Sequence, residues 1–149
     1  MHVSAIIAAG GSGTRLAAGM PKQFVSVGGQ TMLERSLSAF VAHARITEVI
    51  LALPPDTKAE GDIGQHVGKL RVVIGGTRRQ DSVANAFDAV SSQAEIVLVH
   101  DAARPFVSAD VISRSIDAAF PRSRLEACRR AGRYRPRPLC RVAKRGSPR

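Results

Sequence analysis

The sequence is poor in the features that mark several protein classes. It has only two cysteines, Cys128 and Cys140, too few for a disulfide framework or for a zinc site with four cysteine ligands. No apolar run approaches the roughly 20 residues that a membrane-spanning helix needs. The first apolar stretch, residues 3–9, follows no basic leader and runs into glycines, so it does not predict a signal peptide. These absences predict a cytoplasmic protein without a membrane partner.

Acidic residues are almost missing from the last part of the chain. Residues 121–149 hold 11 Lys and Arg residues and one acid, Glu126, so they carry the whole formal net charge of +10. The same segment has a single tyrosine, Tyr134, and no recurring apolar spacing. Such a composition buries little apolar surface, so we expect residues 121–149 to be a disordered basic tail. The folded part is expected to end near Phe120.

Residues 1–120 alternate between short apolar runs and amphipathic segments, in a chain of 149 residues that is long enough to bury a core. A helix is expected after Thr31, because Glu34 stands at the spacing of a capping box. Further helices are expected over 81–90 and 108–120, and strands over 3–8, 48–53, 70–74 and 96–99. Apolar strands separated by helices predict an α/β fold with a Rossmann-like, doubly wound, mainly parallel sheet.

Three loops, residues 9–15, 75–82 and 100–105, follow predicted strands. In doubly wound sheets ligands bind beyond the carboxyl ends of the strands. The first loop holds Gly10, Gly11 and Gly13, whose backbone N–H groups can approach phosphate oxygens, and Arg15 and Lys22 can neutralise the charge. A plain strand-to-helix turn with solvated cations explains the glycines equally well. The spacing fits neither a P-loop nor the dinucleotide fingerprint.

The loops together resemble a known family. The segments Ala9-Gly10-Gly11-Ser12-Gly13-Thr14-Arg15 and Pro21-Lys22-Gln23-Phe24 resemble the signature of nucleotidyltransferases. Three further segments resemble one family of these enzymes: Gly75-Gly76, Arg79-x-Asp81-Ser82-Val83 and His100-Asp101-Ala102-Ala103-Arg104-Pro105. This family is the 2-C-methyl-D-erythritol 4-phosphate cytidylyltransferase family, of the non-mevalonate isoprenoid pathway. The glycine loop alone is weakly specific, but the three motifs in order are strongly specific. The resemblance covers about residues 3–120.

The resemblance implies a reaction and a set of site residues. The family transfers CMP from CTP to 2-C-methyl-D-erythritol 4-phosphate, releases pyrophosphate and uses Mg²⁺. By resemblance, Arg15 and Lys22 stabilise the transition state, and Asp101 holds Mg²⁺. The residues implied to bind the nucleotide or order its site are Ala9, Gly10, Gly11, Gly13, Gly76, Thr77, Ser82, Ala102 and Arg104.

Several of these residues also have a purely structural interpretation. Asp81 and Ser82 fit the cap of the following helix equally well. Arg79 fits a surface residue or a loop anchor. Asp101 ends a buried strand, where an unpaired carboxylate is costly, and this favours a metal ligand over a cap. His100 is predicted to be structural rather than catalytic.

The chain departs from the family after residue 120. Family members are substantially longer, and their Pro-Val-x-Asp-Thr-x-Lys and Gln-Thr-Pro-Gln stretches are not recognisable in residues 121–149. We therefore expect residues 1–120 to be the nucleotide-binding part of a domain whose sheet is incomplete at its C-terminal end. A frameshift in the gene or a truncated gene sequence explains such a tail. Either one removes the C-terminal half of the domain, so we expect impaired activity. The family's homodimer is not expected here, because it uses the missing part.

An alternative of another class takes the tail at face value. It makes the chain a nucleotide-binding remnant or scaffold without catalysis, whose basic tail binds nucleic acid through counterion release. Tyr134 alone provides no series of aromatic rings for base stacking, so only nonspecific binding is expected. The other reading frames of the gene beyond codon 120 distinguish the two, because a frameshift leaves the missing motifs there.

Overall fold

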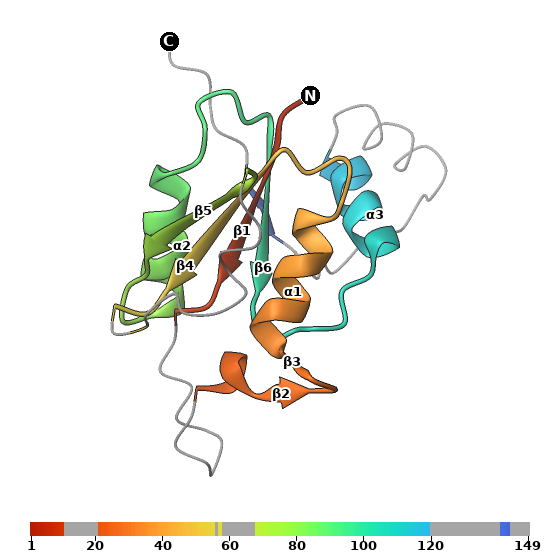
Figure 1. The fold of residues 1–149 in the computed structure, drawn as a ribbon. Helices are drawn as coiled ribbons and strands as arrows, with labels where there is room; N and C mark the ends of the chain where they lie inside the picture. Colours follow the sequence, from red (N-terminus) through yellow and green to blue (C-terminus); the bar gives the residue numbers. More distant parts are fainter. Residues whose placement is uncertain (11–20, 56, 58–67, 120–140, 144–149) are drawn as a thin grey trace, which may run out of the picture.

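The structure is a computed structural model that describes residues 1–10, 21–55, 57, 68–119 and 141–143 (Figure 1). None of the described helices is long and apolar enough to cross a membrane. The elements, in chain order, are β1 (Val3–Ala8), the 3-10 helix η1 (Lys22–Phe24), β2 (Ser26–Val27), β3 (Gln30–Thr31), α1 (Met32–Val41), β4 (Glu48–Leu53), β5 (Leu70–Ile74), α2 (Arg79–Asp88), β6 (Ile96–Asp101), α3 (Ala109–Ala119) and β7 (Arg141–Ala143).

The main sheet has the strand order β5-β4-β1-β6-β7. Strand β1 runs parallel to both of its neighbours, with Ile6 opposite Ile50 of β4 and Val99 of β6. Strand β5 is parallel to β4. All six residues of β1 are buried, because strands flank it on both edges and helices cover both faces. The predicted α/β fold with a mainly parallel sheet is confirmed.

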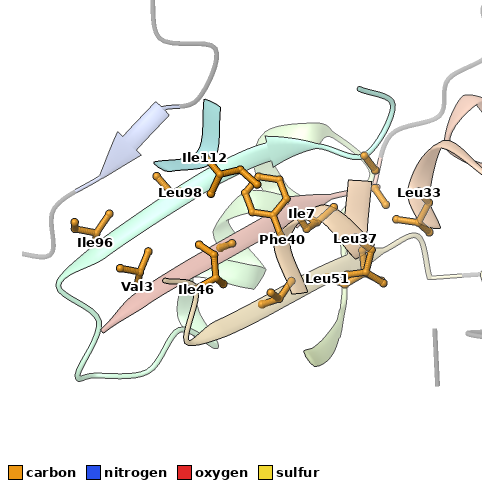
Figure 2. Packing of buried hydrophobic residues seen from close by; sticks show 14 of the residues in the cluster. Val3, Ile7, Leu33, Leu37, Phe40, Ile46, Leu51, Ile96, Leu98 and Ile112 are labelled. Carbon is orange, nitrogen blue, oxygen red and sulfur yellow. The ribbon is translucent and has the colours of Figure 1, made fainter. Parts of the chain in front are cut away.

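The helices lie on opposite faces of the sheet. The first face packs against α1 and α3, around Ile7, Phe40 and Ile112 (Figure 2). The second face packs against α2, where Ile6 and Ile50 meet Ala86 of that helix. Helix α1 connects β1 to β4, whereas α2 connects β5 to β6 in the opposite direction along the sheet. Right-handed crossovers in opposite directions must use opposite faces, and this makes the sheet doubly wound.

Helix α1 begins at the capping box that the sequence predicts. The Glu34 N–H donates to Thr31 Oγ1 at 3.1 Å, and the Thr31 N–H donates to Glu34 Oε2 at 2.6 Å. These bonds satisfy two N–H groups that a helix start otherwise leaves without partners. The side chains of Leu33, Leu37 and Phe40 are buried on the face that meets the sheet. The capping box therefore fixes which face of α1 enters the core.

A short hairpin precedes α1 and was not predicted. Strands β2 and β3 pair antiparallel around Gly28 and Gly29, whose φ angles are 59° and 83°. Two successive residues with positive φ form the type of turn that matches the twist of a two-residue hairpin. The Arg35 guanidinium holds the turn by donating to the carbonyl oxygens of Val27 and Gly28 at 2.7 and 3.0 Å. The hairpin lies beyond the carboxyl end of the sheet (Figure 1).

One short piece of the basic tail belongs to the sheet. Residues Arg141–Ala143 form β7, which pairs antiparallel with β6 at the edge of the sheet. The expected disorder therefore does not hold for these three residues. Residues 121–140 and 144–149 lie outside the described part, and the expectation of disorder stays a prediction for them.

The packing of the core predicts that two phenylalanines contribute very differently to the free energy of unfolding. Phe40 is fully buried between α1 and the sheet, whereas Phe106 is 78% exposed. Phe40→Ala should lower the free energy of unfolding by about 3–5 kcal/mol, because it removes buried apolar surface and leaves a cavity. Phe106→Ala should change it by less than about 0.5 kcal/mol. Urea unfolding of both variants checks this, and equal losses would contradict the described packing.

Candidate functional site

The four parallel strands of the sheet end at one edge, where the predicted loops begin (Figure 1). Ala8, the last residue of β1, pairs with Ala52 of β4 on one side and with Asp101 of β6 on the other. The loops after β1, β5 and β6 therefore start at the same edge of the sheet, as the sequence predicts. Of the residues implied for this site, Gly11, Gly13 and Arg15 lie outside the described part of the chain.

The end of β1 touches the start of α2 with no room for a side chain. A Cβ atom on Gly10 would lie 2.0 Å from Ser82 Oγ, and one on Gly75 would lie 2.7 Å from the same oxygen. A Cβ atom on Gly76 would lie 2.3 Å from Asp81 Cβ. Such distances are far below van der Waals contact, so glycine is required at these positions for the close approach of the three backbone segments. The contact brings two of the predicted loops together.

Ser82 holds this contact in place. Its side chain is buried, and its Oγ accepts the Gly76 N–H at 3.0 Å. The carbonyl oxygens of Gly76 and Arg78 each lie 3.2 Å from Oγ as acceptors for the hydroxyl proton. The hydroxyl is therefore fully used in connecting the β5–α2 loop to the first turn of α2.

Asp81 provides the cap of α2. Its carboxylate accepts the backbone N–H of Arg78 at 3.3 Å and the Arg78 guanidinium at 2.8 and 2.9 Å. The hydrogen bonds from Arg78 lower the pKa of the Asp81 carboxyl, and the same pair raises the pKa of Arg78. The capping interpretation is confirmed for Asp81. Helix α2 begins at Arg79, two residues before the predicted start.

Lys22 is held beside the end of β1 by its neighbour Gln23. The buried Gln23 side chain donates from Nε2 to the Ala9 carbonyl oxygen at 2.8 Å. This bond fixes η1 against the sheet edge, so the backbone of Lys22 is placed there as well. Lys22 itself is partly exposed and has no ion-pair partner among the described residues.

Ala102 joins three elements through its backbone. Its N–H donates to the Ala8 carbonyl oxygen at 3.1 Å, and its own carbonyl oxygen accepts Ser36 Oγ of α1 at 3.0 Å. The Ala9 N–H is likewise used, on the Ala52 carbonyl oxygen at 3.0 Å. The described residues implied for the site divide into two groups. The buried floor consists of Ala9, Gly10, Ser82 and Ala102, and the more exposed rim consists of Lys22, Gly76, Thr77, Asp101 and Arg104.

Asp101 is paired with two arginines. Arg79 Nε of α2 donates to Oδ1, and Arg104 Nε lies 3.2 Å from Oδ2 in an ion pair. The three side chains are 30%, 53% and 58% exposed in the order Asp101, Arg79, Arg104, so solvent screens the pairs partly. The sequence argument for a metal ligand assumed that the Asp101 carboxylate has no partner in the protein. That assumption is wrong, because two arginines pair with it. The described residues contain no group of three or more His, Cys, Asp or Glu side chains that could hold a metal ion.

His100 has the surroundings of a structural residue. It is 4% exposed, and its ring centroid lies 4.9 Å from that of Phe40. Its Nε2 lies 3.1 Å from the Arg104 carbonyl oxygen, which can only accept, so this nitrogen carries the proton. Burial lowers the pKa of the imidazole. A neutral His100 therefore anchors the loop that carries Asp101 and Arg104.

Sequence reasoning missed the supporting roles of Gln23 and Ser36, and it did not identify the partner of Arg79. A signal for Ser36 was present, because it stands three residues after Leu33 on the predicted apolar face, where a polar residue needs a buried partner. For Arg79 the sequence offers a loop anchor as one of two alternatives, and the ion pair with Asp101 agrees with it. Its partner is distant in sequence, so no local pattern could identify it.

Comparisons with known proteins support the same interpretation of the chain. The family model described as IspD, 2-C-methyl-D-erythritol 4-phosphate cytidylyltransferase, matches residues 3–126. A relative from Clostridium botulinum with the same enzyme name is 43% identical over 121 residues, which cover 78% of this chain and 52% of the relative. A bifunctional IspD/IspF enzyme from Solidesulfovibrio magneticus is 41% identical over 129 residues, which cover 79% of this chain and 32% of the relative.

Solved structures agree in fold. The 4-diphosphocytidyl-2C-methyl-D-erythritol synthase from Anaerococcus prevotii has a TM-score of 0.63 at 34% identity, over 78% of this chain and 50% of that chain. The 2-C-methyl-D-erythritol 4-phosphate cytidylyltransferase from Thermus thermophilus has a TM-score of 0.59 at 38% identity, over 89% and 52%. The chain thus spans about half of these structures, and one third to one half of the two curated relatives above.

The buried hydroxyl of Ser82 predicts a measurable loss. Ser82→Ala should lower the free energy of unfolding by about 1–3 kcal/mol, because the partly buried Gly76 N–H loses its acceptor. The matched variant is Ser115→Ala, whose hydroxyl donates only to the Val111 carbonyl oxygen within α3. That variant should stay within about 0.5 kcal/mol of the original protein. Chemical denaturation of both checks the difference, and an unchanged Ser82→Ala protein would contradict the described network.

The lowered pKa of His100 predicts a loss of stability on acidification. The unfolded chain binds a proton at this histidine near its ordinary pKa of about 6.5, while the folded protein resists protonation until the pH is lower. The contribution of His100 is therefore fully present above about pH 6.5 and decreases as the pH falls below it.

Thermal unfolding between about pH 8 and pH 5.5 measures this effect. His100→Gln, which keeps a donor for the Arg104 carbonyl oxygen, should flatten the dependence. The hydrogen bonds from Arg78 and from the His2 backbone lower the pKa of Asp81 and of Glu95, which moves their protonation further to the acid side of the histidine range. The same decrease in both proteins would show that His100 does not cause it.

Proposed function

Because the chain belongs to the 2-C-methyl-D-erythritol 4-phosphate cytidylyltransferase family, we propose that its described part holds CTP at the carboxyl edge of the sheet. The reaction is the transfer of CMP to 2-C-methyl-D-erythritol 4-phosphate with release of pyrophosphate, a step towards isoprenoid precursors. The observation that carries the proposal is the junction of Gly10, Gly75 and Ser82, where the loops after β1 and β5 pack against the Ser82 side chain with no room for a side chain of their own.

The floor and the rim have different tasks in this proposal. The backbone groups of Ala9 and Ala102 and the hydroxyl of Ser82 are used inside the protein, so these residues shape the surface on which the nucleotide lies. Gly76 and Thr77 border the base and ribose at the same edge. Gly10, with Gly11 and Gly13 beyond the described part, supplies close backbone approach to the triphosphate.

Lys22 and Arg15 act on the charge that develops during transfer. The acceptor phosphate oxygen attacks the α-phosphorus of CTP, the new P–O bond forms there, and the bond to the leaving pyrophosphate breaks. Negative charge increases on the leaving group, and a fixed cation lowers the energy of that state. Lys22 is suited to this role because Gln23 fixes its backbone beside β1 and no described carboxylate neutralises it.

Asp101 fits a site for Mg²⁺ that is completed by the substrate. Mg²⁺ is commonly bound through one or two carboxylates together with substrate phosphates and water, rather than by a full set of protein ligands. The single, partly exposed carboxylate of Asp101 at the sheet edge matches that donor set. When bound, the cation would neutralise charge on the phosphates. Arg104, held by the turn at the end of β6, orders the carboxylate or meets the acceptor.

Apart from Arg104, no described residue is proposed to hold the acceptor of the reaction. Holding the two substrates in line can contribute about 7–11 kcal/mol to the lowering of the barrier. The motifs that do this in the family are not recognisable in residues 121–149, so we propose that the chain binds CTP but transfers CMP slowly. We propose that the protein is cytoplasmic and that its substrates are small molecules. We propose neither a homodimer nor specific binding to nucleic acid.

A hybrid protein tests the reaction and the role of Lys22. Residues 1–119 followed by the C-terminal half of the Clostridium botulinum relative should release pyrophosphate from CTP and 2-C-methyl-D-erythritol 4-phosphate. In this hybrid Lys22→Ala should lower kcat by about a hundred- to a thousandfold, because one cation is lost from the developing charge. The affinity for CTP, measured by calorimetry, should fall by less than about tenfold, since ground-state contacts contribute less.

The matched control is Lys69→Ala. Lys69 is exposed and precedes β5 at the opposite, amino end of the sheet. Both kcat and CTP affinity should stay unchanged in that variant. A hybrid that binds no CTP would overturn the proposed function, whereas full turnover after Lys22→Ala would overturn only the role of this lysine.

A further inference from the structure

The ion pair between Arg79 and Asp101 spans the end of the central strand. Arg79 is the first residue of α2, which follows β5, whereas Asp101 ends β6. In the strand order β5-β4-β1-β6, both β4 and β1 lie between these two strands. The first turn of α2 lies close to the end of β1, because Ser82 Oγ of this turn packs directly against Gly10. The Arg79 side chain then completes the span by reaching Oδ1 of Asp101.

This position is where a ligand of such a sheet is expected. The crevice beyond the carboxyl ends of the strands, next to the central strand, is the usual binding place in doubly wound sheets. The pair is well exposed, with Arg79 53% and Asp101 30% accessible, so a ligand can reach it. A nucleotide that enters along β1 therefore meets this ion pair.

Both carboxylate oxygens of Asp101 are already in use. Arg79 takes Oδ1 and Arg104 takes Oδ2. A divalent cation that binds Asp101 must therefore compete with at least one guanidinium, and it is also repelled by both. Exposed ion pairs of this kind commonly contribute less than about 1 kcal/mol. A divalent cation can therefore displace a guanidinium from Asp101.

The two arginines differ in how firmly they are attached. Arg104 belongs to the same turn as Asp101, where its N–H donates to the Asp101 carbonyl oxygen at 3.0 Å and its own carbonyl oxygen accepts His100 Nε2 at 3.1 Å. Arg79 comes from another element, and its guanidinium has no further described partner. Arg79 is therefore the arginine that can leave without disturbing the turn.

We propose that Arg79 is a positioning residue that occupies Asp101 in the absence of ligand and releases it to the divalent cation when the nucleotide binds. The proposal rests on the proposed function, in which Asp101 holds the cation. Before binding, Arg79 neutralises the carboxylate and keeps it oriented at the sheet edge. After release, its positive charge stays at the start of α2, on the same edge as the triphosphate.

The competition between Arg79 and the cation is tested with Mn²⁺ alone in the 149-residue chain, followed by the electron paramagnetic resonance signal of the free ion. Binding is expected to be weak, because the substrate phosphates that complete the site are absent. Arg79→Gln should raise the affinity for Mn²⁺ by about two- to fivefold, because the competing ion pair is gone. The matched control, Arg78→Gln, removes a neighbouring charge that pairs with Asp81 instead, and it should leave the affinity unchanged. In an Asp101→Asn background, Arg79→Gln should have no effect on Mn²⁺ binding.

The outcomes separate this proposal from a merely structural anchor. An anchor would lower the thermal midpoint of Arg79→Gln without raising its affinity for Mn²⁺, and that result would overturn the proposal. So would a gain that persists in the Asp101→Asn background, or Mn²⁺ binding that is insensitive to Asp101→Asn. The proposed function is tested separately, by calorimetric titration of the same variants with CTP and Mg²⁺. If CTP binds to none of them, the proposed function is contradicted, whereas the Mn²⁺ measurements still test the role of Arg79.

Discussion

The candidate site depends on a close contact between three glycines and the first turn of α2. Gly10, two residues after β1, and Gly75 and Gly76 after β5 pack against the side chains of Ser82 and Asp81, at distances that leave no room for a Cβ atom. Glycine is therefore required here for proximity, since none of these three residues has a positive φ angle. If this contact were opened by a few ångströms, the first turn of α2 would move away from β1. Arg79 would then lose its reach to Asp101, and the floor of the site would divide.

The fold was largely predictable because its local signals agree. The apolar runs at 3–8, 48–53 and 70–74 match the strands, and the capping box at Thr31 marks the start of α1. The hairpin β2–β3 was missed, although two adjacent glycines between short apolar segments are typical of such a turn. Strand β7 could not be predicted, because its three residues gain their structure only by pairing with the distant edge of β6.

The candidate site was predictable in position but not in its internal chemistry. Loops after parallel strands must meet at one edge, so the placement of residues 75–82 and 100–105 follows from topology. Which polar atoms are used inside the protein does not follow from topology. Gln23, Ser36 and Arg79 each bond to a partner that lies at least 14 positions away in the sequence, and these bonds decide that Ala9 and Ala102 form floor and that Asp101 is paired. The distinction between floor and rim is therefore a result of three-dimensional packing.

The central place of β1 has a consequence for how the chain acquires its structure. Strand β1 comes first in the sequence, but its two neighbours, β4 and β6, begin at residues 48 and 96. During synthesis the apolar β1 segment has no partner for either edge until β4 leaves the ribosome, and one edge stays open until β6 follows. Contacts of such long sequence separation slow folding, and unpaired apolar strands favour association with other chains. The order of strands that creates the candidate binding edge therefore also leaves the central strand without both partners until β6 has been synthesised.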